Sequence, residues 1–217
     1  MPSVKHRSFV TAAEEPFERV SDPIQGLMLQ VRGDPIFHRT EYPIEIDVDA
    51  SYDYASGIRA TAWELRESGR FKAKRFFADR QGQGPNHAEL CAAIEGLRAG
   101  HMYSDSPIHL RTDNKLSAAI ITNLWQARQR HIEVLSEELQ PILESHEFIA
   151  LTWVRTREVR RVDAAAREIK DRLRQSKAPW LDGWKYEGDA AAAVIWRLHN
   201  QARKSHLPKK RRRNPFD

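Results

Sequence analysis

The chain has 217 residues, of which 41% are hydrophobic and 30% charged, and its formal net charge is +5. The positive excess lies at the C-terminal end, because residues 201–217 carry a net +6 and residues 1–200 sum to −1. A near-neutral body argues against a protein that coats nucleic acid with a uniformly basic surface. A single cysteine, Cys91, excludes an internal disulfide framework and a cysteine-based zinc site.

The length and the hydropathy pattern suggest one domain with extensions. No apolar run approaches the ~20 residues of a membrane span, and residues 1–17 lack the apolar stretch of a signal peptide. We therefore expect an intracellular protein, cytoplasmic or, in a eukaryote, nuclear. We expect an N-terminal extension over residues 1–41, an α/β domain over 42–177, and a C-terminal helix with a basic tail over 178–217.

The N-terminal third predicts an irregular extension followed by a meander of strands. Residues 1–41 are interrupted by prolines and glycines and contain only short apolar pieces. From residue 44 to 49 apolar and acidic side chains alternate, which is typical of a strand. Apolar segments at 58–65 and 71–78 flank residues 66–70, which predicts an antiparallel hairpin with a five-residue loop.

The rest of the domain predicts alternating helices and strands. Apolar residues at helical spacing predict a helix from Asn86, its expected N-cap, to about residue 100. Further helices are expected over 115–127 and in the segments around 132–142 and 162–173. Short strands are expected at 108–113 and 148–154, where Trp153 is interpreted as a core residue. A last amphipathic helix is expected around 191–202.

Four acidic residues occupy corresponding positions on these expected elements. Asp49 and Asp113 lie at strand ends, Glu89 in the first turn of a helix, and Asp163 at the start of a later helix. Ligands of α/β sheets gather at strand ends and helix starts, so the four can converge. Clustered carboxylates repel one another unless a cation is present, and oxygen ligands suit Mg²⁺ or Mn²⁺. Taken singly, each acid is more often structural, at a helix start or in a turn.

Short motifs around these acids resemble the ribonuclease H family, in its reverse-transcriptase-like, short-loop branch. Asp49-Ala50-Ser51 is similar to the family's D-[GA]-S, and Asn86 to Leu90 reads as its N-x-x-E-L. Thr112-Asp113-Asn114 is similar to T-D-[SN], and Trp153-Val154 followed by Asp163 to W-V-x₈-D. No single motif is specific, but four in this order on these elements are specific together.

The resemblance implies a fold, an activity and a set of ligands. The expected fold is α/β, with a ribonuclease H-like mixed sheet of five strands, three antiparallel and then two parallel, flanked by helices. The expected activity is endonucleolytic hydrolysis of the RNA strand of an RNA–DNA hybrid by a two-metal mechanism with Mg²⁺ or Mn²⁺. The resemblance makes Asp49, Glu89, Asp113 and Asp163 the catalytic metal ligands.

Several positions depart from the family pattern and keep other functions open. No His precedes Asp163 in its loop, and Val159 stands where the short branch often has Asn. A non-catalytic or weakly active nucleic-acid-binding module on the same fold is therefore one alternative. A related metal-dependent 3′–5′ exonuclease is another, although such enzymes usually begin D-x-E and here the triplet is Asp47-Val48-Asp49. Asp47 shares a strand face with Asp49, and Asp49 is preferred because Ala50-Ser51 follows it.

The expected contacts to substrate come from polar residues near the acids and from basic residues. Each candidate has a structural alternative: turn formation for Ser51 and Asn114, helix capping for Asn86, and a solvated surface for Arg155 and Arg157. The basic tail has two functional interpretations, since it can bind nucleic acid or a targeting receptor.

Overall fold

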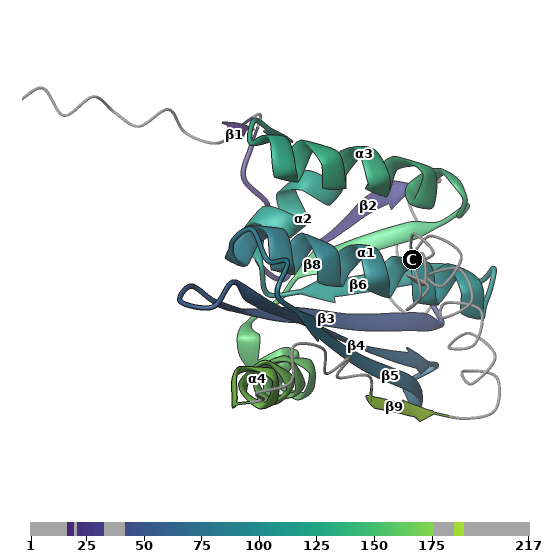
Figure 1. Cartoon of the computed structure of the whole chain (residues 1–217). Helices are drawn as coiled ribbons and strands as arrows, with labels where there is room; N and C mark the ends of the chain where they lie inside the picture. The colour runs from purple at the N-terminus through teal and green to yellow at the C-terminus, as the bar shows by residue number, and fades with distance from the viewer. Residues whose placement is uncertain (1–16, 20, 33–41, 176–184, 189–217) are drawn as a thin grey trace, which may run out of the picture.

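The computed structural model describes residues 17–19, 21–32, 42–175 and 185–188 (Figure 1). The elements run β1 (Phe17–Arg19), β2 (Met28–Arg32), β3 (Ile44–Asp53), β4 (Ile58–Glu67), β5 (Arg70–Asp79), α1 (Pro85–Tyr103), β6 (Ile108–Thr112), α2 (Lys115–Ile121), β7 (Trp125–Ala127), α3 (Arg130–Glu144), β8 (Ile149–Trp153), a 3₁₀ turn (Thr156–Glu158), α4 (Arg160–Gln175) and β9 (Lys185–Gly188). The helix expected around 191–202 and the basic tail lie outside the described residues.

One mixed sheet forms the centre of the domain, with strand order β2-β8-β6-β3-β4-β5-β9. Strands β3, β4 and β5 are antiparallel, and β6 and β8 continue the sheet in parallel beyond β3. These five strands confirm the expected ribonuclease H-like α/β fold. The expectation of five strands was incomplete, because β2 and β9 add antiparallel edges. Residues 1–41 were expected to be irregular, yet β2 joins the sheet and β1 pairs with β7.

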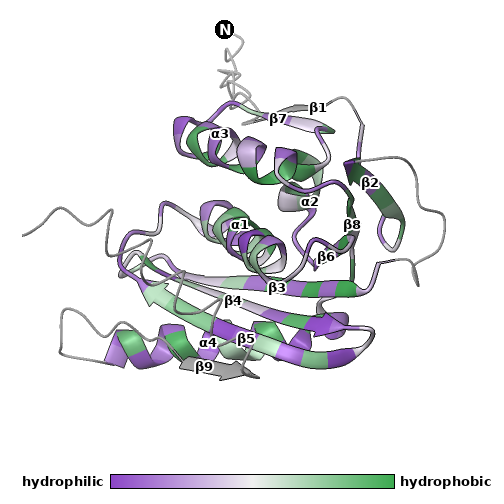
Figure 2. Ribbon diagram, turned by 90° about the vertical axis from the view of Figure 1, so that its right-hand side faces the viewer, coloured by the Kyte–Doolittle hydropathy of each residue, from purple (hydrophilic) through white to green (hydrophobic). Residues whose placement is uncertain are grey.

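Helices cover both faces of the sheet, and the two faces of β3 differ in chemistry. Helices α1, α2 and α3 lie on one side and α4 on the other (Figures 1 and 2). On β3, Ile44, Ile46 and Val48 belong to the large core with α1. Because successive strand side chains point to opposite faces, the alternating acids of β3 point toward the α4 side. The strand pattern read from the sequence therefore places Asp49 away from the main core.

Three local predictions were wrong for identifiable reasons. The β4–β5 hairpin was expected to have a five-residue loop, but its loop has only two residues, Ser68 and Gly69. Both have positive φ angles, 47° and 76°, which is the conformation that two-residue hairpin turns require. Helix α1 begins at Pro85, so Asn86 lies inside it and Gly84 is the N-cap residue. Helix α2 stops at Ile121 because Asn123 takes a left-handed φ of 57°, and residues 125–127 form β7 instead of continuing the helix.

Helix α1 packs closely on the sheet at its glycines. A Cβ at Gly96 would lie 2.5 Å from Val48 Cγ1 and 3.2 Å from Ile46 Cγ2.

Among the described helices, none is both long enough and apolar enough to span a bilayer.

We expect Gly96→Ala to lower the free energy of unfolding by about 1 kcal/mol, measured by urea titration. The β-branched Val48 cannot rotate away easily, so overpacking outweighs the gain in helix propensity. Gly100→Ala is the matched control in the same helix, because its new Cβ would meet the mobile Cδ1 ends of Ile46 and Ile108. An equal or larger loss for Gly100→Ala would contradict this account.

Candidate metal centre

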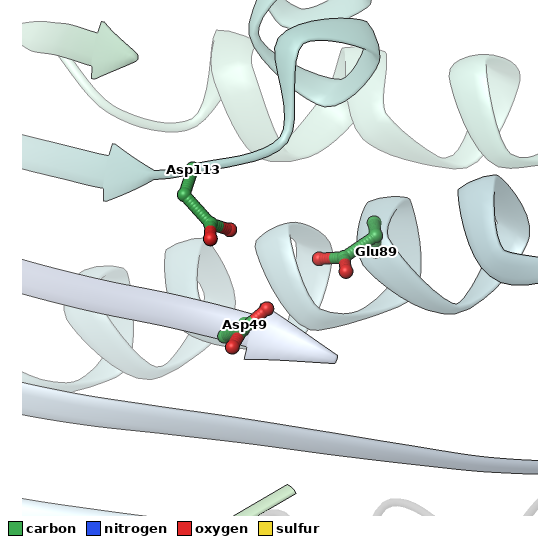
Figure 3. A group of neighbouring side chains, drawn as sticks. All are labelled: Asp49, Glu89 and Asp113. Carbon is green, nitrogen blue, oxygen red and sulfur yellow. The ribbon is translucent and has the colours of Figure 1, made fainter. Parts of the chain in front are cut away.

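Three carboxylates from three separate elements meet beside the C-terminal end of β6, at the middle of the sheet (Figure 3). Asp49 lies inside β3, which continues to Asp53, and not at the strand end where it was expected. Glu89 lies on α1, and Asp113 directly after β6. One oxygen from each lies within 4.8 Å of the others. Glu89 was expected in the first turn of its helix. It is the fifth residue of α1 and therefore lies in the second turn.

The fourth expected acid, Asp163, approaches Asp49 from α4. It is not a member of the group of three, but after burial and repulsion from Asp113 its carboxylate also contributes to the raised pKa of Asp49. Its Oδ1 also lies 2.7 Å from Nε of Arg167, one helical turn further along, in an ion pair. Asp163 is thus placed beside the group and is partly neutralised by its own helix.

The electrostatics of the group are unfavourable without a cation. Burial, with repulsion from Asp113 as the next cause, raises the pKa of Asp49 to about 8. Burial and then Asp49 and Asp113 raise the pKa of Glu89 well above its ordinary value. Glu89 Oε2 is buried and has no hydrogen-bond partner, whereas Asp49 Oδ1 accepts from the backbone N–H of Ala50 at 2.7 Å. A buried oxygen without a partner and an all-carboxylate donor set fit a hard divalent cation such as Mg²⁺ or Mn²⁺.

The structure separates Asp49 from Asp47, which the sequence places on the same face. Asp47 Oδ2 accepts from Arg66 Nη2 at 2.8 Å, and Asp47 Oδ1 lies 3.3 Å from Arg111 Nε. Burial raises the pKa of Asp47, and the charges of Arg111 and Arg66 pull it back toward its ordinary value. Within the described residues no arginine or lysine forms an ion pair with Asp49. Asp49 is therefore the acid of β3 that remains free for a cation.

Two neighbouring polar groups hold the main chain around Asp113. Asn114 is the N-cap of α2, and its Oδ1 accepts from Ser117 N at 2.7 Å, a capping role in place of the turn role that the sequence had left open. The indole Nε1 of Trp153 donates to the carbonyl oxygen of Asp113 at 2.9 Å. Sequence reasoning missed this support, because the two residues are 40 positions apart and no local pattern connects them.

The remaining expected substrate contacts differ in how far they are exposed. Ser51 follows Asp49 by two residues on β3 and is half-buried, as is Asn86 near the start of α1. Arg155 and Arg157 are exposed on the segment between β8 and α4. Arg157 shares the lining of an open pocket with Arg66, Arg160 and Arg161. Their role toward a substrate stays a prediction.

Comparison with known families identifies the class of protein. Residues 47–169 match the family described as reverse transcriptase-like. The match spans more than half of the chain, so the chain belongs to this family. The ribonuclease H assignment that the motifs suggested is confirmed. Comparison with curated protein sequences gave no match.

Solved structures support the same fold. An N-terminal RNase H domain from Mycobacterium tuberculosis, solved as a fusion with maltose-binding protein, is 19% identical with a TM-score of 0.58, over 62% of this chain and 98% of that one. RNase H1 from Halobacterium salinarum is 24% identical with a TM-score of 0.54, over 59% of this chain and 98% of its own. LC11-RNase H1 in complex with an RNA/DNA hybrid is 15% identical with a TM-score of 0.54, over 61% and 99%. At these identities the likeness establishes the fold alone.

Proposed function

We propose that this protein is a metal-dependent endonuclease that hydrolyses the RNA strand of RNA–DNA hybrids. The observation that carries the proposal is the approach of Asp49, Glu89 and Asp113 oxygens to within 4.8 Å of one another, while no basic side chain of the described residues pairs with Asp49. Membership of the reverse-transcriptase-like family and the likeness to an RNase H1 solved with an RNA/DNA hybrid support the substrate class.

Different residues of the chain would bind the metal ions and the substrate in such a reaction. Asp49, Glu89 and Asp113 would hold Mg²⁺ or Mn²⁺, with Asp163 beside them. When bound, two such ions supply an activated water and stabilise the oxygen that leaves the phosphodiester. Arg155 and Arg157, which are exposed on the segment that leads into α4, would contact phosphates of the bound duplex without reading its sequence.

The test is cleavage of matched RNA–DNA, RNA–RNA and DNA–DNA duplexes, each labelled on either strand and incubated with Mg²⁺, Mn²⁺ or EDTA. We expect cuts in the RNA strand of the hybrid alone, lost in EDTA, and unaffected when both ends of the RNA are blocked. Equal cleavage of all three duplexes would contradict the substrate class. Loss of cleavage on blocking the ends would identify an exonuclease, which Asp47 disfavours because two arginines already hold it.

A non-catalytic binding module is the second candidate, and one observation favours it. Val159, at the position where the short branch often carries Asn, is 1% exposed and packs in the core beneath α4. It therefore offers no polar group to a substrate or product. Hybrid binding that persists in EDTA, with no cleavage in Mg²⁺ or Mn²⁺, is the result that this candidate predicts.

A further inference from the structure

Residues 21–32, which we call the N-terminal strap, lie outside the family match yet run along the edge of the sheet nearest the site. Strand β2 pairs antiparallel with β8, with Met28 opposite Thr152 and Leu29 opposite Leu151 (Figure 1). Before β2, the strap continues past the end of β8, where Gly26 N donates to Trp153 O at 2.8 Å. The strap therefore holds the backbone of Trp153 directly.

The strap also holds the side chains that surround Trp153. Asp22 Oδ2 lies 2.9 Å from Lys115 Nζ, the first residue of α2. That ammonium lies over two indole rings, 5.3 Å from the centroid of Trp125 and 5.9 Å from that of Trp153. Trp125 Nε1 in turn donates to Ser21 O at 2.9 Å. The charged pair thus ties the first residues of the strap to the start of α2, and the indole hydrogen bond ties them to β7.

Trp153 connects this assembly to the acidic group. Its indole Nε1 donates to Asp113 O at 2.9 Å, and the neighbouring Val154 N donates to Thr112 O at 2.8 Å. The main chain that carries the Asp113 carboxylate is therefore fixed from β8, and β8 is covered at its open edge by the strap. We propose that the N-terminal strap is a positioning element of the candidate metal centre, which acts through Trp153 on the main chain of Asp113.

Support of the Asp113 main chain matters for metal binding because metal ligands tolerate little displacement. Ligands of a small hard cation must reach near-ideal geometry, and the groups that orient them typically change metal affinity tenfold or more when they are removed. Trp153 touches no metal in this scheme, so it is a positioning residue. The inference rests on the proposed function only in that Asp49, Glu89 and Asp113 bind the cation.

The test compares two Trp→Phe substitutions in the full chain by Mn²⁺ titration. Trp153→Phe keeps an aromatic ring and removes the N–H donor, so we expect the Mn²⁺ dissociation constant to rise about tenfold. Trp63→Phe is the matched control, because Trp63 is buried and its indole N–H has no hydrogen-bond partner. It should lower the melting temperature yet leave the dissociation constant within about twofold of wild type.

A second pair of variants tests the strap itself. Asp22→Asn releases Lys115, and we expect the Mn²⁺ dissociation constant to rise about threefold. The control is Glu168→Gln, which breaks an exposed pair with Arg172 on α4 and should change nothing. If the strap acts through Trp153, adding Asp22→Asn to Trp153→Phe should produce no further change.

The outcomes separate this inference from the proposed function. An unchanged dissociation constant for Trp153→Phe, or equal changes for Trp153→Phe and Trp63→Phe, overturns the inference and leaves the nuclease proposal standing. Tight Mn²⁺ binding that responds to Trp153→Phe, in a protein that cleaves no hybrid, overturns the nuclease proposal alone. A wild-type protein that binds no Mn²⁺ overturns both.

Discussion

Replacing Asp49 by Asn is expected to reduce hybrid cleavage by at least about a thousandfold and, at the same time, to stabilise the metal-free fold. The loss follows because bound metal supplies several kcal/mol of transition-state stabilisation, and each 1.36 kcal/mol is tenfold in rate. The gain follows because burial and repulsion from Asp113 raise the pKa of Asp49 to about 8, and no basic side chain of the described residues pairs with it. Without metal at pH 8, we expect the free energy of unfolding to rise by about 1–3 kcal/mol.

Asp47→Asn is the matched control, since it makes the same change two residues earlier on the same strand face. Asp47 is bound by Arg66 and lies beside Arg111, so its loss leaves both guanidinium groups with one carboxylate fewer. We expect cleavage to stay within about tenfold of wild type and the free energy of unfolding to fall by about 2 kcal/mol. Single-turnover cleavage and urea titration measure both effects. Equal losses of cleavage in the two variants would contradict the proposal that Asp49, and not Asp47, is a metal ligand.

The metal-free protein is expected to lose stability as the pH rises from about 4 to about 8. An ordinary aspartate has a pKa of about 4, whereas burial and repulsion from Asp113 raise the pKa of Asp49 in the folded state to about 8. Between these values the unfolded chain has released its proton and the folded chain has kept it. Because the folded state then binds more protons, raising the pH favours unfolding, and the effect ends above the folded pKa. The raised pKa of Glu89 acts in the same direction.

Divalent cations should reverse this loss, because they bind the ionised carboxylates of the folded state. At pH 8 we expect saturating Mn²⁺ to raise the melting temperature by roughly 5 °C or more, and at pH 5 by much less. In Asp49→Asn, both the fall with pH and the Mn²⁺ response should be smaller. Differential scanning fluorimetry across pH, with EDTA or Mn²⁺, provides the measurement. A Mn²⁺ response that is as large at pH 5 as at pH 8 would disagree with proton release at this site.

Local patterns in the sequence were enough for the order and type of the central elements. The alternation of apolar and acidic residues in β3, and helical spacing in α1, α3 and α4, depend on neighbours within a few positions. The motifs around the four acids were sufficient to indicate the family. The predicted ends of strands and helices were wrong where the backbone conformation of single residues set them, as at Ser68 and Gly69 in the β4–β5 turn.

The edges of the sheet could not be predicted in the same way. Strand β2 exists because β8 offers it an open edge about 120 residues later in the chain, and residues 28–32 alone show no strong alternation. The pairing of β1 with β7 has the same origin. Such strands are specified by their partners more than by their own side chains.

By itself the sequence determined the class of fold, the family and the identity of the acids that can meet. Only the tertiary structure decided which of these acids has a counter-charge among the described residues, because Arg66 and Arg111 reach Asp47, and not Asp49, from strands β4 and β6. It also decided that Trp153 supports Asp113 and that the N-terminal strap supports Trp153. The physical reason is the same in each case: hydrogen bonds and ion pairs between distant segments depend on where the sheet brings them together, and no local periodicity encodes that meeting.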